Sequence, residues 1–230
     1  MTQQMTKIAN PAACDPRTSV TRSLLGYGVI AGPVYIVVSL AQALTRDGFD
    51  LARHQWSMLA IGDLGWIQIA NFMVAALATV ICAVGLRRAL TPGRGATWAP
   101  RLVGAYGVSL IGAGIFRADP AMGFPVGTPE GPGAISWHGM LHFACGVVGF
   151  LCVIAACFAI GRRFAAANRT GWAVYSWLTG VLFLAAFAAV AAGAGAVWAN
   201  LSFVAGVVII WAWLSALSLH LYRYTTAEHA

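Results

Sequence analysis

The fold is decided by residues 64–86, LGWIQIANFMVAALATVICAVGL, an uncharged run between Asp63 and the pair Arg87 and Arg88. As an α-helix this run would be about 34 Å long, which exceeds the ~30 Å hydrocarbon core of a bilayer. It has no continuous polar face of the kind that a helix on a water-soluble protein presents. The run therefore predicts a transmembrane helix.

Similar runs lie on both sides of it. Fifteen uncharged residues between Arg101 and Arg117 would cover only about 22 Å as a helix. Fifty-three uncharged residues between Arg169 and Arg223 are enough for two spans with a tight turn near Gly193, Gly195 and Asn200. We expect an all-α bundle of six transmembrane helices at about residues 23–45, 64–86, 101–118, 136–161, 172–193 and 199–221, with tails at 1–22 and 223–230. Gly28 and Gly32, four residues apart, predict close helix packing by the first span.

The composition supports a membrane protein. Of 230 residues, 60% are apolar and 9% are charged, against roughly 25% charged residues in an ordinary soluble domain. The net charge of +7 comes from short basic clusters beside the apolar runs. That placement indicates membrane topology and does not indicate nucleic-acid binding.

The basic residues also predict the orientation of the spans. Three lie on one side, Arg46, Arg53 and Arg117. Eleven lie on the other side: Lys7, Arg17, Arg22, Arg87, Arg88, Arg94, Arg101, Arg162, Arg163, Arg169 and Arg223. The positive-inside rule places the eleven, and both termini, in the cytoplasm.

Because thirteen of the fourteen basic residues are Arg and 26 residues are Gly, we expect a bacterial plasma-membrane protein. Its cysteines are interpreted as small core residues.

Chemically varied side chains gather at the outer ends of the spans, so the outer face is the candidate site. We expect a ligand-binding pocket there formed by His54, Ser57, Asp63, Gln68, Asn71, Arg117 and Asp119, next to His138 and His142. Gln68 and Asn71, three residues apart, would share one helix face. Polar residues at this depth usually face the bundle interior, either at a functional site or in hydrogen bonds that only orient the helices.

The pair His138 and His142 suggests a metal site as an alternative. Imidazoles at positions i and i+4 can bind one zinc ion, and Asp63, Asp119 or His54 could supply a third ligand. No glutamate is placed as a general base for a hydrolase that would use such an ion. A haem site is disfavoured because His220 has no partner at its level.

Two further alternatives concern the outer interface. Arg117 and Asp119 form either a local ion pair or a site where Arg117 holds an anionic headgroup or carboxylate. Trp56, Trp66, Trp137 and Trp198 are interpreted as an aromatic belt.

The order His54, Ser57, Leu59, Gly62, Gly65-Trp66, Gln68 and Asn71-Phe72, followed by Asp119-Pro120 and His138, resembles a known family. This is a bacterial group of six-span membrane proteins of the DUF998 type, and the resemblance covers about residues 24–222. Where the family often has Phe-Pro before the acid, this chain has Phe116-Arg117. The resemblance implies the six-span architecture and adds weight to the outer-face residues. It implies no activity.

We therefore expect a membrane protein that binds a lipid or a small amphiphile at its outer face. The alternatives are a metal-dependent intramembrane lipid hydrolase and a small-molecule transporter. Below Asn71 the second span offers only Thr79 and Cys82 as polar groups, which argues against proton-coupled transport.

Overall fold

The computed structural model describes residues 16–193 and 195–227, and this part of the chain is helical apart from its connections. Residues 1–15, with most of the expected N-terminal tail and Cys14, and residues 228–230 lie outside the described residues. The elements are α1 (Pro16–Thr45), the 3-10 helix η1 (Trp56–Ala60), α2 (Gly65–Leu90), α3 (Trp98–Ile115), α4 (Trp137–Ala166), α5 (Thr170–Ala192) and α6 (Val197–Ala227).

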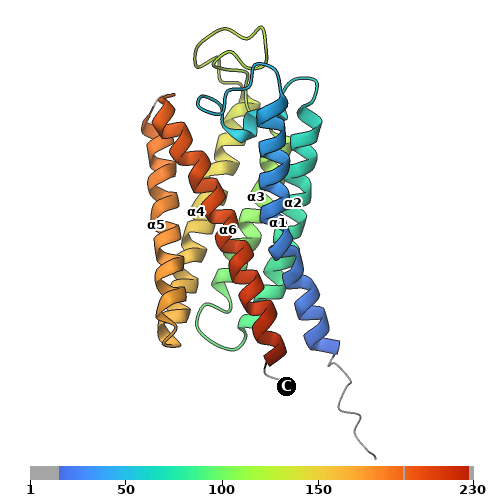
Figure 1. Ribbon diagram of the computed structural model, residues 1–230, viewed down its shortest axis with the longest axis vertical. Coiled ribbons are helices and arrows are strands. Elements are labelled where there is room, and N and C mark those ends of the chain that lie inside the picture. Colours follow the sequence, from blue (N-terminus) through green and yellow to red (C-terminus); the bar gives the residue numbers. More distant parts are fainter. Residues whose placement is uncertain (1–15, 194, 228–230) are drawn as a thin grey trace, which may run out of the picture.

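The six α-helices form a closed ring. Each packs against the next along the chain, and α6 packs against α1. Figure 1 shows α6 crossing the bundle obliquely between α5 and α1, with the loops after α1 and α3 folded over one end. We call this the outer end, and the opposite end, with the α2–α3 and α4–α5 connections, the basic end.

The bundle is apolar on its outside and carries polar groups inside. Exposed side chains include Val37 and Leu44 on α1, Leu77 on α2 and Leu151 on α4, whereas Ser39, Gln68 and Ser218 have no exposed surface. Five helices, all except α3, are long and apolar enough to cross a membrane. The expectation of an all-helical membrane protein is confirmed. With 18 residues, α3 is about 27 Å long.

Two glycines bring α1 close to α6, as their spacing predicts. A Cβ atom on Gly28 would lie 2.3 Å from both Cys82 Sγ of α2 and Ser218 Oγ of α6. A Cβ atom on Gly32 would lie 2.9 Å from the carbonyl oxygen of Trp211. Only a residue without a side chain allows this approach, which is how small residues act in membrane bundles.

The first and last helices are longer than the apolar runs alone predict. Helix α1 begins at Pro16 instead of residue 23, and α6 continues to Ala227 instead of 221. The extensions are tied down by neighbours at the basic end: the Arg22 guanidinium lies 4.5 Å from the ring centroid of Tyr222. Arg88 Nε donates a hydrogen bond to Thr21 Oγ1 at 3.1 Å. The length of an uncharged run reflects the thickness of the hydrocarbon core, and a helix can continue beyond that core into the headgroup region.

Candidate functional site

A buried group of polar side chains links α1 to α2 in the outer half of the bundle. Ser39, Gln42, Gln68 and Asn71, here called the amide cluster, are each at most 6% exposed. Gln42 Nε2 donates to Gln68 Oε1 at 2.8 Å, and Gln68 Nε2 donates to Ser39 Oγ at 3.1 Å. Asn71 Nδ2 lies 3.1 Å from both Ser39 Oγ and the carbonyl oxygen of Tyr35. The structure thus brings together Gln68 and Asn71 of the predicted site.

Helix periodicity explains why these residues meet. Tyr35, Ser39 and Gln42 follow one another at intervals of four and three residues, so they lie on one face of α1. Gln68 and Asn71 have the matching spacing of three on α2. Two polar stripes therefore face each other inside an otherwise apolar interface.

Three buried polar atoms in and beside the cluster have no hydrogen-bond partner within the described residues. They are Gln42 Oε1, Asn71 Oδ1 and Trp56 Nε1. Trp56 belongs to η1, which packs against α1 and α2, and its ring centroid lies 6.1 Å from that of Tyr35. Each unpaired buried group costs about 1–3 kcal/mol. Two of these atoms are hydrogen-bond acceptors and one is a donor, and none of the three groups carries a formal charge.

Aromatic rings border the cluster. The Tyr35 ring stacks on Trp211 of α6 with centroids 5.1 Å apart, and it lies 5.9 Å from the ring of Phe72. Tyr106 of α3 approaches Trp211 at 5.6 Å. These rings form an apolar boundary that four helices share.

The predicted residue His54 lies outside this cluster, in the loop that covers the outer end. It is 1% exposed, and its Nδ1 accepts a hydrogen bond from the backbone N–H of Asp50 at 2.8 Å. Nε2 then carries the hydrogen and donates to the carbonyl oxygen of Met122 at 2.9 Å. The Nδ1 bond stabilises the loop after α1, and the Nε2 bond joins this loop to the loop after α3.

Hydrogen bonds from two other side chains, Arg46 and Asn200, stabilise the same loops. Arg46 donates from Nη1 to the carbonyl oxygen of Leu59 at 2.5 Å and from Nη2 to that of Ile61 at 2.7 Å. Burial lowers the pKa of Arg46, and the charge of Asp63 partly opposes this shift. Asn200 Nδ2 donates to the carbonyl oxygen of Leu51 at 2.9 Å, which joins the loop to α6.

The remaining predicted ligand residues do not converge with the amide cluster. Asp63 and Arg117 are exposed, and Ser57 is half-buried with no hydrogen bond from its hydroxyl group within the described chain. Asp119 accepts from the backbone N–H of Ser136 at 2.7 Å and from its hydroxyl group at 2.6 Å. Asp119 thus holds the first turn of α4, and no ion pair joins it to Arg117 among the described residues.

The two histidines of α4 have different surroundings. His142 is buried, and its Nδ1 lies 3.0 Å from the carbonyl oxygen of Ala113 and 2.8 Å from that of Phe116. His138 is exposed and its ring lies 3.6 Å from that of Trp137. No group of three or more His, Cys, Asp or Glu side chains suited to a metal ion occurs in residues 16–193 and 195–227.

Sequence reasoning missed Tyr35, Ser39 and Gln42, because the first span was interpreted only as a packing helix. The signal was present: Ser39 and Gln42 are polar residues three apart inside an uncharged run, the spacing that singled out Gln68 and Asn71. Trp56 was assigned to the interfacial belt, whereas it is 5% exposed.

Comparison with known proteins gives one family. A family model described as "Protein of unknown function (DUF998)" matches residues 29–220. No curated protein and no solved structure matches the chain.

Proposed function

Because the chain belongs to the DUF998 family, whose function is unknown, we propose its function from the amide cluster. The protein is a membrane receptor or carrier that binds the polar group of a lipid or small amphiphile among Gln42, Asn71 and Trp56. The observation that carries this proposal is the set of three buried polar atoms that have no hydrogen-bond partner in the part of the chain that the structure describes.

The chemistry of these atoms defines the ligand. Gln42 Oε1 and Asn71 Oδ1 accept hydrogen bonds, and Trp56 Nε1 only donates. A group with two hydrogens to donate and a lone pair to accept is complementary, for example a primary amide or a diol. The bordering rings of Tyr35, Phe72 and Trp211 suit an apolar chain or ring attached to that group. A charged headgroup is disfavoured because the cluster holds no charge to pair with it.

The proposed topology has six spans with both described ends in the cytoplasm. Helix α3 is shorter than its neighbours, but it packs against α2 and α4 as a full member of the ring. The arginine-rich connections lie at the basic end, which supports a cytoplasmic position for that end. The amide cluster then lies in the outer half of the membrane, as expected for the predicted outer-face site.

The outer loops have a supporting role in this proposal. The side chains of His54, Arg46 and Asn200 form hydrogen bonds with backbone carbonyl and amide groups of the loops. They therefore hold η1, and with it Trp56, over α1 and α2. We assign them to positioning the cover of the site.

Thermal unfolding of the detergent-solubilised protein tests the proposal. Added ligand at 100 times its Kd stabilises a protein by about 2.7 kcal/mol. We expect a 1-monoacylglycerol, which carries a diol, to raise the unfolding midpoint, whereas the fatty acid methyl ester of the same chain length has no donor and leaves it unchanged. Gln42→Met and Asn71→Leu should each abolish the shift.

The matched control is Thr79→Val. Thr79 is also buried in α2, but its hydroxyl group donates to the carbonyl oxygen of Ala75 in its own helix at 2.7 Å. This variant should keep the ligand response. Equal shifts with the methyl ester, or no shift with any donor-bearing amphiphile, would contradict the proposal and leave the cluster as a hydrogen-bonded link between helices.

A transporter is the second candidate, and α6 supplies the observation that favours it. Ser215 Oγ donates to the carbonyl oxygen of Gly28 at 3.3 Å, and Ser218 Oγ lies 3.3 Å from Cys82 Sγ. These neutral groups continue a polar line from the amide cluster toward the basic end. No Asp or Glu is buried in the described residues, so the line suits a neutral solute. Uptake into proteoliposomes of a diol that passes the binding test distinguishes transport from binding alone.

A further inference from the structure

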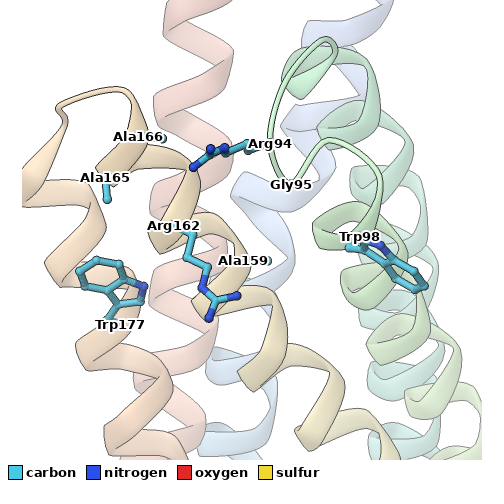
Figure 2. Close-up of a pocket in the computed structure, with 8 residues that line it drawn as sticks. All are labelled: Arg94, Gly95, Trp98, Ala159, Arg162, Ala165, Ala166 and Trp177. Carbon is cyan, nitrogen blue, oxygen red and sulfur yellow. The ribbon is translucent and has the colours of Figure 1, made fainter.

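A second candidate site lies at the basic end of the bundle, whereas the amide cluster lies in the outer half. A cavity of about 730 Å³ is bounded by the α2–α3 connection, the last turns of α4 and the first part of α5. Figure 2 shows Arg94 and Arg162 between the indole rings of Trp98 and Trp177, with Gly95 and Ala159 beside them. This volume is in the range of small-molecule sites.

Four of the arginines at this end form two pairs with different roles. Arg163 donates from Nη1 to the carbonyl oxygen of Arg94 at 2.9 Å. Arg87 donates from Nη1 to the carbonyl oxygen of Ala96 at 2.6 Å and to Thr97 Oγ1 at 2.8 Å. These two side chains fix the backbone of the connection. The connection also depends on Gly93 and Gly95, with φ of 132° and 76°, values that residues with a side chain rarely adopt.

The other pair, Arg94 and Arg162, lines the cavity. Within the described residues neither guanidinium group has a hydrogen bond or an ion pair. The ion pair in this part of the chain joins Arg53 to Glu130 at the outer end. The described acidic residues, Asp47, Asp50, Asp63, Asp119 and Glu130, all lie in the outer loops. Two guanidinium groups therefore line one cavity, and none of the acidic side chains in residues 16–193 and 195–227 lies at that end to neutralise them.

The residues around the cavity favour a lipid as the anion that pairs with Arg94 and Arg162. Trp98 is 65% exposed, and tryptophan side chains favour the junction between headgroups and acyl chains. Basic pockets between transmembrane helices on the cytoplasmic side suit anionic headgroups, and guanidinium forks match phosphate oxygens in pairs. If the phosphate group of a phospholipid lay between Arg94 and Arg162, the acyl chains of that lipid would lie beside the two indole rings.

We propose that Arg94 and Arg162, with Trp98 and Trp177, form a binding site for the phosphate group of an anionic phospholipid of the cytoplasmic leaflet. This site is separate from the amide cluster, and it would hold even if the neutral ligand proposed there did not bind.

Native mass spectrometry of the full chain in a neutral detergent tests this proposal. Phosphatidylglycerol and phosphatidylcholine with identical acyl chains are titrated against the wild type. The charge-matched variants are Arg94→Gln with Arg162→Gln, and Arg169→Gln with Arg223→Gln as the control. Both pairs remove two positive charges from the basic end, but Arg169 and Arg223 do not line the cavity.

We expect the wild type to prefer phosphatidylglycerol, and the Arg94/Arg162 double variant to bind it about tenfold more weakly. The control pair should change the affinity less than about twofold, and Arg162→Lys should be intermediate because lysine keeps the charge without the fork. Equal binding of the two lipids by the wild type, or an equal loss in the control pair, would overturn the proposal. Displacement of phosphatidylglycerol by millimolar inorganic phosphate would overturn the assignment to a lipid.

Discussion

His138 and His142 show how different two neighbouring histidines on one helix can be. His142 directs Nδ1 at the carbonyl oxygens of Ala113 and Phe116, where α3 ends, so it joins α4 to α3. His138 is exposed beside Trp137. A zinc ion bound by both imidazoles would also need a third ligand, and no group of three or more His, Cys, Asp or Glu side chains suited to a metal ion occurs in residues 16–193 and 195–227.

Replacing the two histidines separately should give unequal results. We expect His142→Ala to lower the free energy of unfolding by about 1–3 kcal/mol, because buried carbonyl groups lose their donor. His138→Ala should change it by less than about 0.5 kcal/mol, as for an exposed side chain. Thermal unfolding in detergent measures both effects.

Elemental analysis of the same three proteins tests the metal alternative directly. If His142 only joins two helices, zinc content will not differ among wild type, His138→Ala and His142→Ala. About one zinc per chain in the wild type, lost in both variants, would instead establish a shared site and revive the hydrolase hypothesis.

At this scale the sequence singled out Gln68 and Asn71, which are buried, but not the groups that they contact. Gln68 and Asn71 were recognised because amides are costly inside a membrane span unless they have partners. Their partners on α1 depend on the rotation of one helix relative to the other, which the sequence of either helix alone does not define. His54 was assigned to a ligand site because its two partners are backbone groups, which carry no sequence signal.

At the scale of helices, packing of α1 against its neighbours depends on Gly28. We expect Gly28→Ala to lower the free energy of unfolding by about 1–3 kcal/mol, the usual cost of overpacking, because the new Cβ atom would lie 2.3 Å from Cys82 Sγ and Ser218 Oγ. Thermal unfolding of the purified protein gives the measurement.

Gly26→Ala is the matched control, since a Cβ atom there meets nothing within 4 Å. The same change two residues away should leave the protein as stable as the wild type or raise its stability slightly, because alanine favours helix over glycine. Equal effects of the two substitutions would show that α1 tolerates a wider separation from α6.

Apolar runs predicted where each helix lies but were less informative about where it ends. The ends of α2, α4 and α5 are within five residues of the expected spans. The larger difference at Pro16 arises from contacts with α2 and α6, such as that of Arg88 with Thr21, which no local pattern contains. The short run of α3 was recognised, but its helix begins three residues before the expected 101–118, at Trp98, and ends three residues earlier, at Ile115.

For the whole molecule, the decisive question is whether α3 crosses the membrane. Single cysteines at Asp47→Cys, Val126→Cys and Ala167→Cys, in a chain that also carries Cys14→Ser, can be tested with a thiol reagent that does not cross membranes. All three positions are exposed, and the cysteines of the described spans are buried or half-buried.

With six spans, the cysteines at 47 and 126 should react in intact cells, and the cysteine at 167 only after the membrane is permeabilised. The double crossing by α2 and α3 returns the chain to the outer side before residue 126. Labelling at 126 only after permeabilisation, with 47 still accessible from outside, would show that α3 does not cross.

The closed ring also bears on how the chain is assembled during synthesis. Every hydrogen bond described above for the amide cluster joins α1 to α2, so these bonds can form as soon as the first hairpin enters the bilayer. Chains fold from the N-terminal side during translation. Helix α6, whose Trp211 stacks on Tyr35, is therefore the last of the described helices to join the bundle. Until then this side of the cluster faces the bilayer, and a hydrophobic compound taken up by the nascent protein would be enclosed when α6 docks on α1.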